Sequence, residues 1–520
     1  TGRLIYSGGN TTSNKKLSLA AGGVGILDVA AAATELNLSG VIDGSGLLDK
    51  RGPGTVALSG NSTLSGGIRV TAGTLALDYS SGISARVPSG TVFTMAGGTL
   101  EVRGNAFDEV TANIDLVLPL GTSSTVRAVS AGGQPITVDL GTITANGGIV
   151  NFELPTVGSI STTASLGPWA IVNQVAVATK VGNAIAEAVY TADDFSGPTI
   201  NTDVVAATTA SDFSVNAMRF NAAAAKTLTL TGTNTLESGA LLVTPNVGAN
   251  AVTIAGGTLR GSAGGLLGIG HSSTGSLTIS SVIADNTSPT GLLKFGSGAT
   301  TLSGDNSFTG PTTISAGTVV VGHANALPTA SSITVASGAT LRLGVASPAM
   351  GSLTLEANST LDLNARSGSV TGLSGAGLIT STSGNLTTTY NLTVNTAVNS
   401  TFSGSINNSA GRVGLIKNGA GTLTLSGTST YTGGTQILGG VLEFTTLANL
   451  GPSAASSGNI TFNNGGVLRF AGTSNVNLST YHPFVFTGNG VVEVVSPTNS
   501  LTSNPPTWSG PGTWSIRGAG

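Results

Sequence analysis

Cysteine is absent from this chain of 520 residues, which excludes disulfide bonds and thiolate metal sites. A long chain without cysteine suits export from a bacterium, where a thiol would be exposed to oxidation. Charged residues make up only 8% of the sequence, and the formal net charge is −3. Without a basic stripe to neutralise phosphates, nucleic acid is not expected as a partner. No run of 18 apolar residues occurs, so the sequence predicts no membrane span.

Glycine, by contrast, is abundant: the chain has 77 glycines, about twice the usual share. Valine, isoleucine, leucine and threonine are also frequent and regularly spaced. Disordered chains are usually rich in charge and poor in β-branched residues. The composition therefore predicts a folded chain rather than a disordered one.

Two kinds of short unit recur along the sequence, and this self-similarity is its strongest internal signal. The first kind begins with a lysine followed by spaced glycines, and its copies are residues 50–67, 294–310 and 417–434. A second apolar run follows each copy, at residues 74–77, 318–321 and 441–444. The second kind places Thr-Leu or Val-Leu after two small residues, at residues 96–102, 255–260, 337–343 and 464–470.

The period within a unit predicts short strands. In residues 422–425 the side chains alternate between faces, so Leu423 and Leu425 share the buried side. Runs of four to six residues bounded by glycine cannot bury a core alone, but they can if each coil stacks on the next. Sandwiches and barrels favour longer strands with regular hairpin signals. We therefore expect an all-β fold, a parallel β-solenoid with coils of roughly 20–25 residues and a length on the order of 100–120 Å.

One region breaks the pattern. Residues 1–166 and 227–520 are expected to form solenoid coils, whereas residues 167–226 are expected to form an irregular, partly helical excursion. The helical signals lie at Ala184–Tyr190 and Phe220–Lys226, and residues 216–220 are expected to re-enter the solenoid as a strand.

The two ends of the sequence resemble two halves of the lysine-type unit. Residues 517–520 followed by residues 1–8 reproduce it with an insertion of two residues. This match predicts that the chain is one period of a tandem array, with further copies of itself end to end as partners.

The lysine-type units resemble the passenger-associated, or autotransporter-associated, β-strand repeat family. The pattern Lys-x-Gly-x-Gly-Thr-Leu-x-Leu-x-Gly is matched closely by residues 417–444, well by residues 50–77, and by residues 294–321 with changes such as Pro311 in place of a glycine. The resemblance implies a right-handed parallel β-helix in a very large bacterial surface or secreted protein.

Carboxylates that could act in catalysis are few and isolated. Asp193–Asp194 and Asp108–Glu109 are the only adjacent pairs. Neighbours on a strand point to opposite faces, so both pairs are interpreted as loop or capping acids. Glu101 and Arg103 share a strand face and are expected to form an exposed ion pair.

Other residues that often carry chemistry are interpreted as structural. His271, His323 and His482 lack metal-ligand spacing. Gly372–Ala376 is an incomplete nucleophile elbow, and Gly264–Gly270 lacks the context of a phosphate loop and is expected to form turns. Trp169, Trp508 and Trp514 could stack on sugars, but core positions are favoured, above all for Trp514. The threonines of residues 227–231 could form an ice-binding ladder, but solvent-facing β-strand is favoured.

The sequence thus favours a structural, non-catalytic fibre or surface protein located outside a bacterial cell. No catalytic residue, cofactor or metal site is predicted. The alternative is an adhesin that binds cells or polysaccharide through residues 169–212. A β-helical carbohydrate-active enzyme is a weaker hypothesis, since it needs a cluster of acids.

Overall fold

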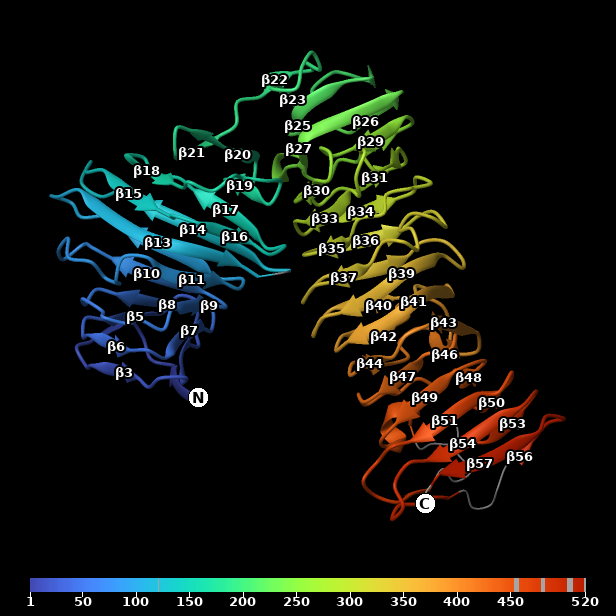
Figure 1. Ribbon diagram of the computed structural model, residues 1–520. Helices are drawn as coiled ribbons and strands as arrows, with labels where there is room; N and C mark the ends of the chain where they lie inside the picture. Colours follow the sequence, from blue (N-terminus) through green and yellow to red (C-terminus); the bar gives the residue numbers. More distant parts are fainter. Residues whose placement is uncertain (120, 453–457, 478–481, 503–507, 519–520) are drawn as a thin grey trace.

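The chain forms two stacks of short strands that lie side by side and meet at one end (Figure 1). This computed structural model describes residues 1–119, 121–452, 458–477, 482–502 and 508–518. It is a parallel β-solenoid of about 22 turns and about 1% helix, which confirms the all-β solenoid prediction. Ala519 and Gly520, which belong to the match between the chain ends, lie outside the described residues. We call residues 2–187 (β1–β21) the N-arm and residues 191–518 (β22–β57) the C-arm.

Successive coils of the N-arm stack in register. Strands β8 (Thr55–Leu58), β10 (Thr74–Asp78), β12 (Thr99–Arg103) and β14 (Ser123–Val129) pair in parallel. Leu75 stands opposite Val56 on one side and Leu100 on the other, and all three side chains are buried. The outward positions between them carry threonine, alanine or charged residues. Each coil alone has little core, and stacking supplies the rest.

The C-arm repeats this arrangement with larger side chains. Strands β47 (Thr422–Leu425) and β49 (Val441–Phe444) pair so that Leu423 stands opposite Leu442 and Leu425 opposite Phe444. All four are buried, as the alternation in residues 422–425 predicts. Two short 3-10 turns, η1 (Pro245–Val247) and η2 (Leu447–Leu450), are the helical elements of the described residues.

An antiparallel meander ends the N-arm. Strand β19 (Ala170–Val172) still pairs in parallel with β17 (Ile149–Glu153), but β20 (Ala176–Val181) and β21 (Ala184–Glu187) run antiparallel to their neighbours. Asn173 and Gln174 make the first turn with φ of 51° and 59°, values that asparagine-like residues tolerate better than β-branched ones. The meander reverses the direction of pairing, so the next coils do not continue the same stack.

The helical expectation within residues 167–226 is wrong. Ala184–Glu187 is strand β21, and Lys226 begins strand β26 (Lys226–Thr231) after a turn. Tertiary pairing overrides the weak helix propensity of these alanine-rich segments. Parallel stacking resumes with β22 (Thr191–Ala192), β23 (Asn201–Asp203) and β25 (Ser214–Phe220), the last of which covers the expected re-entry strand.

The two arms share part of one core. The cluster of buried side chains that fills the N-arm also includes five residues of the C-arm, namely Ala217, Ala240, Leu242, Leu293 and Phe295. The rest of the C-arm has its own continuous cluster. The solenoid is therefore bent rather than one continuous stack, and the C-arm folds back against the end of the N-arm (Figure 1).

Candidate binding cleft between the two arms

The contact between the arms is built from the outward face of the C-arm. In β27 (Thr233–Val243) and β33 (Gly291–Phe295), Leu242 and Phe295 point away from the C-arm core and pack into the N-arm cluster. On the N-arm side the cluster includes Trp169, Ile171 and Val172. The Ser315 hydroxyl also donates a hydrogen bond of 3.3 Å to the Gly147 carbonyl of the N-arm. Strand residues that would face water in a straight solenoid are thus buried by the bend.

Gly268 allows this close approach. A Cβ atom at Gly268 would lie 2.5 Å from Cβ of Pro168 on the N-arm, whereas one at Gly270 would lie 2.5 Å from Cε2 of Phe295, which stands opposite it on the next strand of the C-arm. Both glycines lie within strand β30 (Leu266–His271), so the expectation that Gly264–Gly270 forms turns is wrong over most of that range. Sequence reasoning took them for turn residues because a glycine needed for close packing has no distinguishing local pattern.

A cleft of about 510 Å³ opens beside this contact. Its N-arm wall comes from β14, β17, β19 and the turn after β19. Its C-arm wall comes from the ends of β30 and β33 and from three stacked turns. The lining residues are Ser123, Thr125, Asn151, Ile171, Gln174, Ser272, Phe295, Gly296, Ser297, Ala316, Gly317 and Gly338.

The lysine of the repeat unit fixes the C-arm wall. Lys294 is buried, and its ammonium donates hydrogen bonds to the carbonyls of Phe295, Gly296 and Ala316 at 2.9, 2.8 and 3.2 Å. The first two carbonyls belong to its own corner and the third to the corner of the next coil. One side chain thus satisfies three carbonyls that the turn leaves without ladder partners.

The lysines of the other two lysine-type units also donate hydrogen bonds to the carbonyls of two successive corners. Lys50 donates to the carbonyls of Arg51, Gly52 and Ala72 at 2.8, 2.9 and 3.0 Å. Lys417 donates to those of Asn418, Gly419 and Gly439 at 2.9, 2.8 and 3.0 Å. The lysine of each repeat therefore clamps two successive corners together, and the sequence spacing alone did not reveal this role.

These lysines make stability depend on pH. Burial lowers the pKa of Lys294 to about 7 and those of Lys50 and Lys417 to about 8, from an ordinary value of 10.5. At a pH between the lowered pKa of a lysine and 10.5, the unfolded chain binds more protons than the folded one. The free energy of unfolding therefore rises with pH in this range, by at most about 1.4 kcal/mol per pH unit for each lysine. We expect urea unfolding to show greater stability at pH 9.5 than at pH 7.

Two comparisons check this prediction. Replacing Lys294 with methionine should remove part of the rise, whereas a wild-type stability that falls from pH 7 to 9.5 would contradict it. Above about pH 10 we expect the free energy of unfolding to fall with pH instead of rising, because burial raises the pKa values of Tyr190 and Tyr431 to about 12. These tyrosines stay protonated in the folded chain while the unfolded chain loses their protons.

The structure does not bring the adjacent acids into one site. Asp193 accepts hydrogen bonds from the backbone N–H groups of Val205, Ala206 and Ala207 at 2.8–2.9 Å, so it orders a loop at the start of the C-arm. Asp194 accepts one from the N–H of Ser196. Backbone donors lower the pKa of Asp193 despite desolvation, which acts in the opposite direction. Asp108 and Glu109 are exposed in a loop of the N-arm.

The Glu101–Arg103 pair forms as expected, but it is not exposed. Glu101 is only 9% accessible and contacts Arg103 at 2.6 Å. Arg103 also reaches Glu35 at 2.8 Å, three strands away. Ala57 and Ala76 stand at outward positions on the two strands in between and are fully buried. We attribute their burial to the Arg103 side chain, whose length the expectation of a local pair overlooked.

Replacing Arg103 with alanine should destabilise the N-arm measurably. The change leaves the Glu35 carboxylate without its ion-pair partner, leaves Glu101 paired with Arg127 alone, and uncovers two alanines. We therefore expect a loss of about 1–2 kcal/mol in the free energy of unfolding, reduced at high salt. Arg260→Ala is the matched control, because Arg260 has a single side-chain hydrogen bond, to Thr235. Urea unfolding followed at low and high salt measures both variants, and equal losses for the two would contradict the prediction.

The three histidines occupy unrelated places. His271 is buried in the C-arm core between the hydroxyls of Thr300 and Ser273, at 3.2 and 2.9 Å. His323 lies 3.9 Å from Asp305, and His482 is buried elsewhere in the C-arm. Among the described residues, no group of three or more His, Cys, Asp or Glu side chains is placed to hold a metal ion.

The other candidates also have structural surroundings. Ser374, in the incomplete elbow Gly372–Ala376, lies within strand β41 (Gly368–Gly375) and shares a hydrogen bond with Thr354. The threonines of residues 227–231 alternate with buried leucines and face solvent. In the part of the chain that the structure describes, no helix is long and apolar enough to cross a membrane.

The tryptophans differ from one another. Trp169 is buried in the N-arm cluster, and Trp508 is partly buried against the C-arm core. Trp514 packs against Trp508 and Phe486 but is 51% exposed, so it lies at the edge of the core rather than within it. Its strand, β57 (Trp514–Gly518), pairs with β54 (Gly490–Val494) on one side only, and no further coil covers the ring in the described chain.

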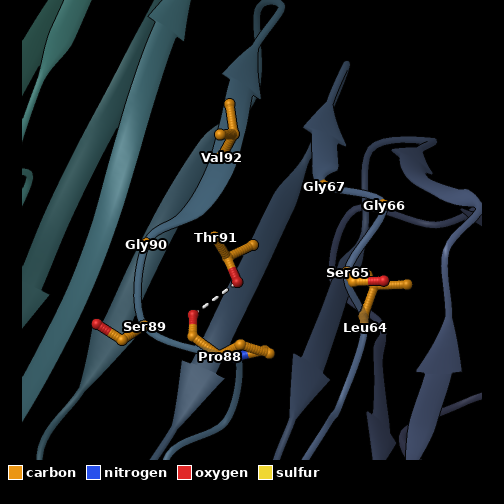
Figure 2. A pocket seen from close by; sticks show the side chains of 9 residues that line it. All are labelled: Leu64, Ser65, Gly66, Gly67, Pro88, Ser89, Gly90, Thr91 and Val92. Atoms are coloured by element: carbon orange, nitrogen blue, oxygen red, sulfur yellow. Dashed lines mark hydrogen bonds between the residues drawn. The ribbon is translucent and has the colours of Figure 1, made fainter.

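A second, smaller groove of about 390 Å³ lies on the N-arm alone (Figure 2). Residues 64–67 and 88–92 of successive coils line it. The hydroxyl of Thr91 already donates a hydrogen bond of 2.6 Å to the Pro88 carbonyl. Because this groove offers mainly glycine and serine corners from one arm, we consider the cleft between the arms the better candidate site.

Comparison with known proteins agrees with the repeat pattern. Residues 48–77, 292–321 and 415–444 match the family called passenger-associated-transport-repeat, and these segments contain the three units whose lysines clamp the corners. A protein described as "Adhesin BmaC autotransporter", from Brucella suis biovar 1 (strain 1330), is 31% identical over 437 residues. The match covers 78% of this chain and 12% of the relative, so the chain spans about an eighth of that protein's length. No solved structure matches the chain.

Proposed function

We propose that this chain, a bacterial cell-surface protein built from passenger-associated β-strand repeats, is a stiff structural module that holds its bend without catalysing a reaction. The observation that carries the proposal is that hydrogen bonds connect successive coils along both arms. Parallel pairing links coil to coil in both arms, and buried lysines clamp the corners at three places. Such stacking gives stiffness along each arm.

The surface supports the same proposal. Threonine, serine and asparagine are common at outward strand positions, and the two adjacent acid pairs singled out from the sequence either order loops or lie exposed. Carboxylates used for acid–base chemistry on a sugar would have to face one another across a substrate. The expected end-to-end assembly with further copies stays a prediction.

Electron microscopy of the purified chain tests this function. We expect uniform particles with two unequal arms meeting at a fixed angle, unchanged by the presence of polysaccharides, and no release of sugar products from them. Particles whose arms vary widely in angle would contradict the stiff module. Product formation from a polysaccharide would contradict its non-catalytic nature.

An adhesive role is the second candidate, since the relative is described as an adhesin and the chain is 31% identical to it. The 169–212 segment, where the sequence placed an adhesive site, contributes Ile171 and Gln174 to the cleft between the arms. Attachment of cells or polysaccharide-coated surfaces to the immobilised chain tests this role, with the chain unfolded in denaturant as the control.

A further inference from the structure

The cleft between the arms carries hydrogen-bonding groups that the chain itself does not use. The side chains of Thr125 and Gln174 on the N-arm wall make no hydrogen bond within the described residues, nor do those of Ser272 and Ser297 on the C-arm wall. Asn151 is largely engaged, since its carbonyl oxygen accepts the Gln174 N–H at 2.9 Å. Free groups thus face the same space from both arms.

These groups are hydroxyls and an amide, and no charged side chain lines the cleft among the residues described. Without a lysine or arginine on its surface, the cleft offers no ion pair to an acidic ligand. Without a carboxylate, it offers no hard ligand set for a cation. Hydroxyls and amides both donate and accept, so the chemistry that fits them is an uncharged molecule with many hydroxyl groups.

Apolar atoms also line the cleft. Ile171 of the N-arm and Phe295 of the C-arm are both mostly buried and reach its surface. A sugar ring presents C–H groups on its faces and hydroxyls on its rim, and it can use apolar and polar lining together. The volume of about 510 Å³ lies within the range of small-ligand sites, which occur preferentially between domains.

We propose that the cleft between the two arms binds a short, uncharged saccharide. The site needs both arms, because Thr125 and Ser272 come from different stacks and line the same cleft only when the solenoid is bent. This proposal rests on the adhesive role suggested above and specifies its ligand class. It does not depend on the stiff-module function, which electron microscopy tests separately.

Ligand-observed NMR with maltotriose, cellotriose and N-acetyllactosamine, and with a glucuronate-containing trisaccharide, tests the proposal on the whole chain. We expect binding of at least one uncharged probe and weaker binding of the acidic one. The double variant Thr125→Val, Ser272→Ala removes one hydroxyl from each wall and should weaken binding about thirtyfold, since each of the two lost hydrogen bonds contributes roughly 1 kcal/mol. Ser297→Tyr should abolish binding by filling the cleft.

Thr393→Val is the matched control. Thr393 is an outward, half-buried threonine of β43 (Thr389–Asn395) and does not line the cleft. Binding by this variant should equal that of wild type. The proposal fails if no uncharged probe binds, or if the cleft variants bind as tightly as Thr393→Val. If the chain attaches to cells while Ser297→Tyr attaches equally well, the adhesive role stands and the saccharide site does not.

Discussion

Replacing Gly268 with valine is expected to separate the two arms. The new Cβ would lie 2.5 Å from Cβ of Pro168, which belongs to a rigid ring on the opposite arm and cannot rotate away. The N-arm must therefore move. Since each coil adds the same rise along its arm, two arms opened into one longer rod would extend the largest dimension of the molecule by about half. Small-angle X-ray scattering measures this change.

The matched control for this prediction is Gly372→Val. Gly372 also lies within a strand of the C-arm, but the nearest atom to its added Cβ would be 3.5 Å away, an ordinary contact. Its scattering curve should resemble that of wild type. Circular dichroism should show intact β-structure in both variants, because each arm keeps its own stacked core. An unchanged curve for Gly268→Val would contradict the predicted separation of the arms.

Replacing Lys417 with methionine should produce the largest loss of stability in the C-arm. The change leaves the carbonyls of Asn418, Gly419 and Gly439 without their donor, at roughly 1–3 kcal/mol for each one that water cannot reach. Removing a buried ammonium offsets part of that cost. We expect a net loss of about 3 kcal/mol, seen as faster hydrogen exchange in the coils on either side of the corner and as a lower urea midpoint.

Lys15→Met is the control, because Lys15 is exposed and its side chain makes no hydrogen bond or ion pair in the described structure. It should leave both measurements unchanged. If Lys417→Met were as stable as Lys15→Met, the desolvation cost of the ammonium would equal its three hydrogen bonds, and the hallmark lysine would have no net stabilising role. If hydrogen exchange in Lys417→Met became faster only far from the corner that Lys417 holds, this result would also contradict the proposed role of the lysine.

Some contacts could be predicted from the residues and others could not. The alternation around Leu423 predicted a buried face because side chains of a strand alternate with a fixed period. The reach of Arg103 to Glu35 could not be predicted, because it depends on the order in which strands stack. Similarly, Gly268 differs from a turn glycine only in what lies opposite it, and that partner, Pro168, is about a hundred residues away in the sequence.

The sequence by itself determined that this protein is a parallel solenoid, where its repeats lie, and which side chains fill each coil. Those features depend on local period and on contacts between neighbouring coils, which the repeat makes regular. The tertiary structure alone decided that the solenoid bends, that the 167–187 region ends one stack with an antiparallel meander, and that the outward side chains of β27 and β33 are buried. These outcomes depend on the packing of coils distant in the chain, for which a repeating sequence carries no local signal.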